Sequence, residues 1–80
     1  MARIVSFAPG GRQTLRMQPT EVICRYSAAI VGTVKIVQLD TAGSKDREFP
    51  NKVSQSLQLD AAQAATLIAI LRAEFDLDLT

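Results

Sequence analysis

The sequence predicts an α+β fold in which an antiparallel sheet of four to five strands, arranged as a meander, is packed by one C-terminal helix over residues 61–75. Short stretches that alternate apolar and polar residues precede residue 60, as is typical of strands with one buried face. Glycine and proline separate these stretches. After Asp60 the apolar residues recur at helical spacing. The 80 residues fit one domain over 1–75 and a short tail over 76–80.

A β-hairpin is predicted at the N-terminus. Residues 3–7 and 14–18 flank the segment "APGGRQ", which is rich in turn-forming residues. In the second arm Leu15 and Met17 point to one face of a strand and Arg16 points to the other. One face of this hairpin is therefore expected to join the core.

The next predicted strand covers residues 21–28. Cys24 and Tyr26 alternate with Arg25 and Ser27, so the two pairs lie on opposite faces. Cys24 shares the expected core face, and a buried structural thiol is favoured over a catalytic one.

The stretch over residues 33–41 is apolar on both faces. Val34 and Ile36 lie on one side, and Val37 and Leu39 lie on the other. This pattern indicates either a β-bulge or a centrally placed strand, and the residues leave both open.

A polar segment over residues 41–51 is bracketed by Gly43 and Pro50 and predicts a long exposed loop. The last strand is expected over residues 52–59. Its Ser56 and Gln58 side chains point to the solvated face.

Asp60 begins the helix as an N-cap, with Gln63 placed to complete a capping box. One stripe of the helix is expected to cover the sheet: Ala61, Ala64, Leu67, Ile68, Leu71 and Phe75. The helix is expected to end near Phe75. The tail "EFDLDLT" then either frays or adds a strand to a sheet edge.

The composition argues against an enzyme. The chain has no histidine and one cysteine, so the common nucleophile and base pairs and the usual zinc ligand sets cannot be assembled. Asp40, Asp46 and Glu48 share the polar loop with two basic residues, and their spacing favours a self-paired charge cluster over a cation site. We therefore expect no catalytic residue, metal or cofactor.

The chain is expected to be cytoplasmic, with no membrane partner. A single cysteine is compatible with a reducing compartment. The N-terminal apolar stretch is too short for a signal peptide, and the apolar run over residues 61–71 is too short to span a bilayer.

Charge is distributed unevenly along the chain. The formal net charge is +1, but residues 1–59 carry eight Lys and Arg against four Asp and Glu, whereas residues 60–80 carry one against four. Arg16, Arg25 and Lys35 are expected to project outward from three successive strands. Together with the loop residues they form the predicted site for nucleic acid or a protein partner: Arg16, Arg25, Lys35, Lys45, Arg47 and Lys52. The alternative is an ordinary solvated sheet face.

A second apolar face on the helix predicts a homodimer. These positions lie away from the core stripe and lack the charges of an exposed helix face: Ala62, Thr66, Ala69, Ile70 and Ala73. Small side chains allow two helices to pair closely across a twofold axis. The alternative is an alanine-rich helix exposed to solvent.

Two resemblances concern the second half of the chain. The segment "VQLDTAGSKDREFPNKVSQSLQLD", Val37 to Asp60, resembles a pattern of short bacterial proteins that continue into one closing helix, and it implies no function. Pro50, Lys52, Ser56 and Leu57, on a strand before a helix, resemble the transcriptional positive-coactivator family. That resemblance implies a curved sheet that binds single-stranded DNA, dimerisation through the C-terminal helices, and Lys52 as a nucleic-acid contact.

These features predict a small non-enzymatic binding module, dimeric, that presents a basic sheet face to nucleic acid or to a nucleic-acid-handling complex. The rival hypothesis is a small inhibitor or adaptor of the kind that phages and mobile elements direct against host complexes such as CRISPR effectors. Small size and the lack of a catalytic set suit both hypotheses.

Overall fold

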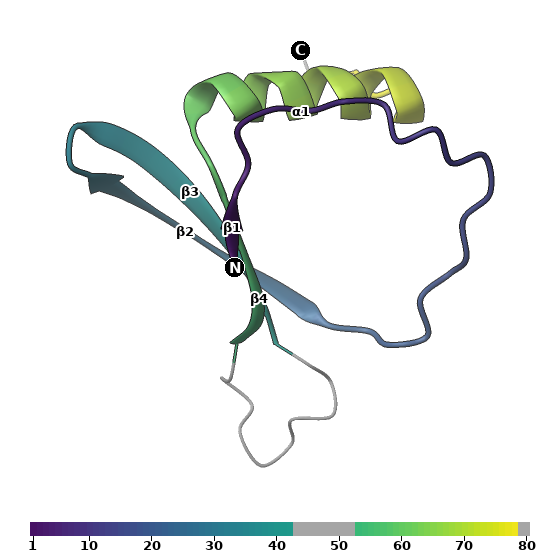
Figure 1. The fold of residues 1–80 in the computed structure, drawn as a ribbon, viewed down its shortest axis with the longest axis horizontal. Coiled ribbons are helices and arrows are strands. Elements are labelled where there is room, and N and C mark those ends of the chain that lie inside the picture. Colours follow the sequence, from purple (N-terminus) through teal and green to yellow (C-terminus); the bar gives the residue numbers. More distant parts are fainter. Residues whose placement is uncertain (43–52, 79–80) are drawn as a thin grey trace.

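A computed structural model describes residues 1–42 and 53–78 of the protein, and these residues form an α+β fold with a four-stranded sheet and one helix (Figure 1). The strands lie side by side in the order β1-β4-β3-β2. The elements, in chain order, are β1 (Ala2–Arg3), β2 (Ile23–Val31), β3 (Val34–Ala42), β4 (Val53–Leu59) and α1 (Ala61–Phe75). The predicted class and the closing helix are confirmed.

The sheet is mixed, so the prediction of a wholly antiparallel meander is wrong. β2, β3 and β4 pair antiparallel, but β1 pairs parallel to β4, with Ala2 beside Leu57. The amide of Ile4 continues this pairing by donating to the carbonyl of Gln58 at 3.0 Å. A parallel neighbour requires a long connection between strands rather than a tight turn.

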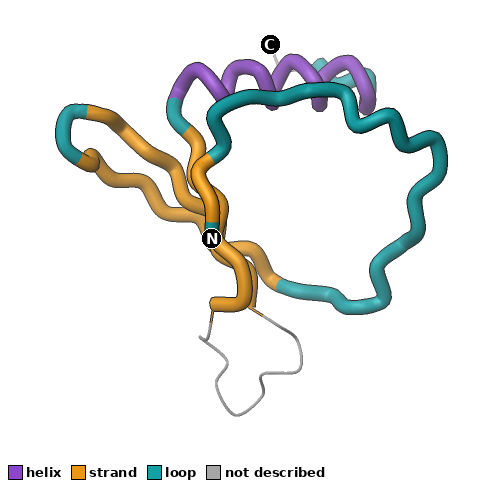
Figure 2. Tube along the Cα trace, in the orientation of Figure 1, coloured by secondary structure: helices purple, strands orange, loops and turns teal. Residues whose placement is uncertain are grey.

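The predicted hairpin of residues 3–7 and 14–18 is not formed. Residues 4–22 instead run as an extended connection from β1 at one edge of the sheet to β2 at the other (Figure 2). Arg3 and Ile4 pair with β4 instead of with residues 14–18.

Gly32 closes the hairpin between β2 and β3. Val31 and Val34 are the last paired residues, which leaves a two-residue loop. Gly32 has a φ of 66°, as a type II′ turn requires at its first central position. The hairpin extends well beyond the rest of the sheet (Figure 1).

β3 is a central strand, which resolves the two interpretations of its apolar faces. It pairs with β2 without interruption from Val34 to Ala42. On its other side it pairs with β4, and the register shifts only between Thr41 and Ala42. Neighbours on both sides explain why apolar residues occupy both faces.

The ends of α1 follow the sequence signals. The Asp60 carboxylate accepts a hydrogen bond from the Gln63 amide at 2.9 Å, as expected of an N-cap. In a capping box the Gln63 side chain would also bond the backbone amide of Asp60. Here the Gln63 side chain instead donates to the carbonyl of Val5 at 2.9 Å. The helix ends at Phe75, where Asp76 adopts a left-handed φ of 53°.

The single chain has a very small core. Among the described residues, the buried apolar side chains are Ile36 and Leu59, which are 8% and 6% exposed. α1, which lies entirely within the described part of the chain, has no buried residue. The predicted core stripe is therefore wrong for the single chain: Ala64 and Leu67 are half-buried, and Ala61, Ile68, Leu71 and Phe75 are exposed. The predicted burial of Cys24 is also wrong, because this thiol is exposed.

In the part of the chain that the structure describes, no helix has the length and apolar character needed to cross a membrane.

Candidate functional site

The register of the strands sorts the sheet residues into two faces. Residues paired across neighbouring strands point to the same side, and successive residues of a strand point to opposite sides. We call one side the polar face, after the polar side chains that it carries near its centre: Arg3, Arg25, Ser27, Gln38, Asp40, Ser56 and Gln58. Toward the β2–β3 turn the same side carries the apolar residues Ala29, Val31, Val34 and Ile36. We call the other side the apolar face, after Tyr26, Ala28, Val37, Leu39, Leu57 and Leu59, and it also carries Lys35 and Thr41.

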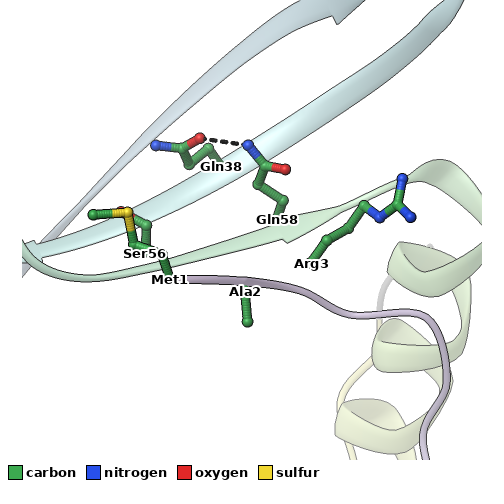
Figure 3. A pocket seen from close by; sticks show the side chains of 6 residues that line it. All are labelled: Met1, Ala2, Arg3, Gln38, Ser56 and Gln58. Atoms are coloured by element: carbon green, nitrogen blue, oxygen red, sulfur yellow. Dashed lines mark hydrogen bonds between the residues drawn. The ribbon is translucent and has the colours of Figure 1, made fainter.

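A chain of hydrogen bonds runs across the polar face from β4 to β3. Gln58 donates through Nε2 to Oε1 of Gln38 at 2.8 Å, and Gln38 donates through Nε2 to Oδ1 of Asp40 at 2.9 Å. Ser56 donates its hydroxyl to the same carboxylate oxygen at 2.5 Å. Figure 3 shows the two amide side chains side by side. These bonds hold the polar groups in fixed orientations.

Hydrogen bonding lowers the pKa of the Asp40 carboxyl group. The Ser56 hydroxyl, and after it the Gln38 amide, lower the pKa of Asp40 below its ordinary value, while desolvation opposes them. Both donors stabilise the ionised form. Asp40 therefore stays negatively charged under all ordinary conditions.

Two arginines flank the hydrogen-bonded side chains. Arg3 pairs in register with Gln58 on β4, and Arg25 pairs with Asp40 from β2. Both arginines are exposed. The backbones of the two arginines lie about 16 Å apart, because three strand spacings of about 4.8 Å and an offset of two residues, about 7 Å along the strands, separate them.

Two shallow hollows on the polar face share Gln38 and Gln58. The larger, about 290 Å³, is lined by Met1, Ala2, Arg3, Gln38, Ser56 and Gln58 (Figure 3). The smaller, about 140 Å³, is lined by Ser27, Ala28, Ala29, Val31, Ile36, Gln38 and Gln58. Together they form an open track from β1 toward the β2–β3 hairpin.

The structure brings together only part of the predicted basic site. Arg25 lies on the polar face. Lys35 lies on the opposite face, because it is an odd number of residues from Asp40 along an uninterrupted strand. Arg16 lies outside any strand, in the connection before β2. The expected stripe over three successive strands is therefore wrong.

The remaining predicted contacts lie outside the described residues. They are Lys45, Arg47 and Lys52, together with Asp46 and Glu48 of the predicted charge cluster. Asp40 of that cluster belongs instead to β3 and the polar face. Among the described residues, no three His, Cys, Asp or Glu side chains are placed to hold a metal ion.

The predicted dimer residues of the helix are exposed in the single chain: Ala62, Thr66, Ala69, Ile70 and Ala73. Thr66 donates its hydroxyl to the carbonyl of Ala62 at 3.2 Å within the helix. Exposure leaves the predicted dimer face accessible to a partner, and the pairing of helices stays a prediction.

Sequence reasoning missed Arg3, Gln38 and Asp40 as members of one site. Ser27, Ser56 and Gln58 were placed correctly on one shared face, although Ser56 is buried rather than solvated. The signal for Gln38 and Asp40 was present as polar residues at alternate positions of an otherwise apolar strand. The position of Arg3 had no such signal, because its parallel pairing with β4 is not encoded locally.

Comparison of the chain with protein-family models, with curated proteins and with solved structures gives no match.

Proposed function

We propose that the protein is a small non-enzymatic binding module that binds single-stranded nucleic acid on its polar face and acts as a homodimer. The observation that carries the proposal is the hydrogen-bonded chain of Gln58, Gln38 and Asp40 between two exposed arginines. Amide and carboxylate groups can bond the edges of unpaired bases, and arginines can bond phosphates. The resemblance to the positive-coactivator family favours the same ligand.

The position of the negative charge restricts how a strand can lie. Phosphates are repelled by the ionised Asp40 near the middle of the polar face and attracted by Arg3 and Arg25 at its margins. A bound strand avoids the repulsion and gains the attraction when its bases lie over the amide side chains and its phosphates lie at the two edges of the sheet. The shallow track through both hollows accommodates an extended strand without a deep pocket.

Few basic side chains lie on this face, so binding is expected to be weak, sensitive to salt and tolerant of sequence. The exposed aromatic ring of Tyr26 lies on the opposite face, where it cannot stack on a base bound to the amides. Affinity therefore depends on the arginines and on hydrogen bonds.

Two charge reversals of equal size test the face. Arg25→Glu is on the polar face and Lys35→Glu is on the opposite face, and each changes the net charge by the same amount. Anisotropy of a fluorescent single-stranded oligonucleotide, measured over a salt series, gives the affinity and its salt dependence. We expect Arg25→Glu to weaken binding by about tenfold or more and to lower the salt slope by about one.

Lys35→Glu is the matched control and is expected to lower the affinity much less. Equal losses in the two variants would show that net charge, rather than the polar face, governs binding. If the unmodified protein binds no oligonucleotide at low salt and co-purifies with a protein complex, the inhibitor or adaptor hypothesis is favoured instead.

A further inference from the structure

The connection between β1 and β2 leaves the sheet almost without support. We call residues 5–22 the arm. Its first residue accepts the hydrogen bond from Gln63, and no residue of the arm makes a backbone hydrogen bond to another described residue. The arm runs past the start of α1 and then projects far from the sheet (Figures 1 and 2).

The arm carries apolar side chains that a folded protein normally buries. Leu15 is 82% exposed and Met17 is 94% exposed, and they alternate with the polar residues Thr14, Arg16 and Gln18. Alternation over five residues is the pattern of a strand with one buried face. The segment therefore has the sequence of a strand, but it pairs with no strand among residues 1–42 and 53–78.

The apolar face of the sheet is covered only in part, since Leu59 is buried and Leu39 is half-buried. Tyr26 is 81% exposed, and Leu57, on the far side of Leu39, is 41% exposed. α1 lies on the side of the sheet away from the polar side chains, yet it buries none of its own residues (Figure 3). Three apolar surfaces, on the arm, the sheet and the helix, thus need a partner.

The area of the uncovered surface indicates how large an interface the partner must form. The chain exposes 7399 Å², whereas a folded monomer of this mass exposes about 4,700 Å². The excess, about 2,700 Å², is close to the 1,000–2,500 Å² or so that each chain buries in an obligate homodimer. A small ligand or a brief encounter would cover far less.

We propose that two copies of the chain exchange their arms, so that Leu15 and Met17 of each copy pack on the apolar face of the other. Tethering of Val5 to the start of α1 directs the arm away from its own sheet. Reciprocal exchange about a twofold axis covers both sheets and leaves no surface for further growth. The polar faces remain open on the outside of the dimer.

An intermolecular distance measurement tests the exchange directly. A nitroxide is attached to a Gln13→Cys/Cys24→Ser variant, and this chain is unfolded and refolded together with an isotope-labelled chain that carries no nitroxide. Amide signals of Tyr26 and Leu57 in the isotope-labelled copy are expected to broaden. The diamagnetic analogue of the label is the control.

Signals of the isotope-labelled copy that stay sharp, together with broadening in a second sample in which nitroxide and isotope label are on the same chain, would mean that the arm folds onto its own sheet, which overturns the proposal. A monomer in light scattering at micromolar concentration would overturn it as well. The exchange rests on the homodimer of the proposed function, and a monomer would contradict both. Oligonucleotide binding by the polar face is measured separately, so its failure is distinguishable from failure of the exchange.

Paired substitutions provide a second test. Leu15→Ser/Met17→Ser removes the apolar side of the arm, whereas Arg16→Ser changes its polar side. The double variant is expected to lose the dimer at micromolar concentration, and Arg16→Ser is expected to keep it. A double variant that stays dimeric would contradict the exchange.

Discussion

At the scale of single residues, the polar face depends on one carboxylate. Asp40 accepts from Ser56 on the neighbouring strand and from Gln38 on its own strand, and Gln38 accepts in turn from Gln58. The donors leave the carboxylate ionised and fix the amides in one orientation. Removal of a donor should therefore raise the pKa of Asp40 and reduce the order of the face.

The first prediction concerns Ser56→Ala. The Ser56 hydroxyl is the largest cause of the lowered pKa of Asp40, so its removal should raise that pKa toward the ordinary value. A carboxyl whose pKa is depressed in the folded state adds stability above its unfolded pKa and loses it as the pH falls through its folded pKa. Ser56→Ala should thus be less stable than the unmodified protein at neutral pH, and it should lose less additional stability between neutral and acidic pH.

Carboxyl titration by NMR gives the pKa, and unfolding between neutral and acidic pH gives the stability. Ser27→Ala is the control, because Ser27 lies on the same face in register with Gln38. An unchanged Asp40 titration in Ser56→Ala would show that the hydroxyl does not stabilise the carboxylate.

The second prediction concerns Gly32→Ala. Gly32 has a φ of 66°, and a Cβ at this position would meet no atom within 4 Å, so the cost of alanine is conformational rather than steric. We expect a loss of about 1–2 kcal/mol in the free energy of unfolding, measured with urea. Gly10→Ala is the matched control, since Gly10 has equal space and no positive φ, and it should change the stability little.

At the scale of elements, local signals predicted α1 better than they predicted the sheet. Asp60 caps the helix and Phe75 ends it, because capping depends on residues a few positions apart. β1 depends instead on Leu57 and Gln58, more than fifty residues away in the chain. The turn residues around Gly11 predicted a hairpin, whereas the structure pairs β1 with β4.

The same distinction explains the candidate site. Period-two alternation placed Arg25 and Ser27 on one face and Cys24 on the other, as the register shows. It could not place Lys35 correctly relative to Arg25, because the relation between two strands depends on their register and not on either pattern alone. Arg3 entered the site only through the parallel strand.

The third prediction concerns Asp60 at the start of α1. Asp60→Ala removes the acceptor for the Gln63 amide and should cost about 1 kcal/mol in the free energy of unfolding. Asp60→Asn keeps an acceptor oxygen and should cost less. Urea unfolding of all variants at one protein concentration makes the comparison. Equal losses in both would indicate that the charge, rather than the cap hydrogen bond, stabilises the helix.

At the scale of the whole molecule, one chain has elements without a closed core. Ile36 and Leu59 are buried, but α1 has no buried residue, and the arm and part of the apolar face are exposed. Alternation and helical periodicity predicted burial of residues such as Leu15 and Leu71, which are exposed in the single chain. These patterns carry no information on whether a partner surface belongs to the same chain. Placing the second copy there accounts for both the sequence pattern and the exposed area.

The fourth prediction follows from a core shared by two chains. When folding and association are one transition, mass action makes the unfolding midpoint depend on protein concentration. A tenfold increase in concentration adds about 1.4 kcal/mol per dimer, which should raise the thermal midpoint by about 3–5 °C for two chains of this size. Calorimetry or circular dichroism over a hundredfold range of concentration measures the shift. A midpoint that stays constant over this range would mean that each chain closes its own core, so that the apolar residues of the arm return to their own sheet.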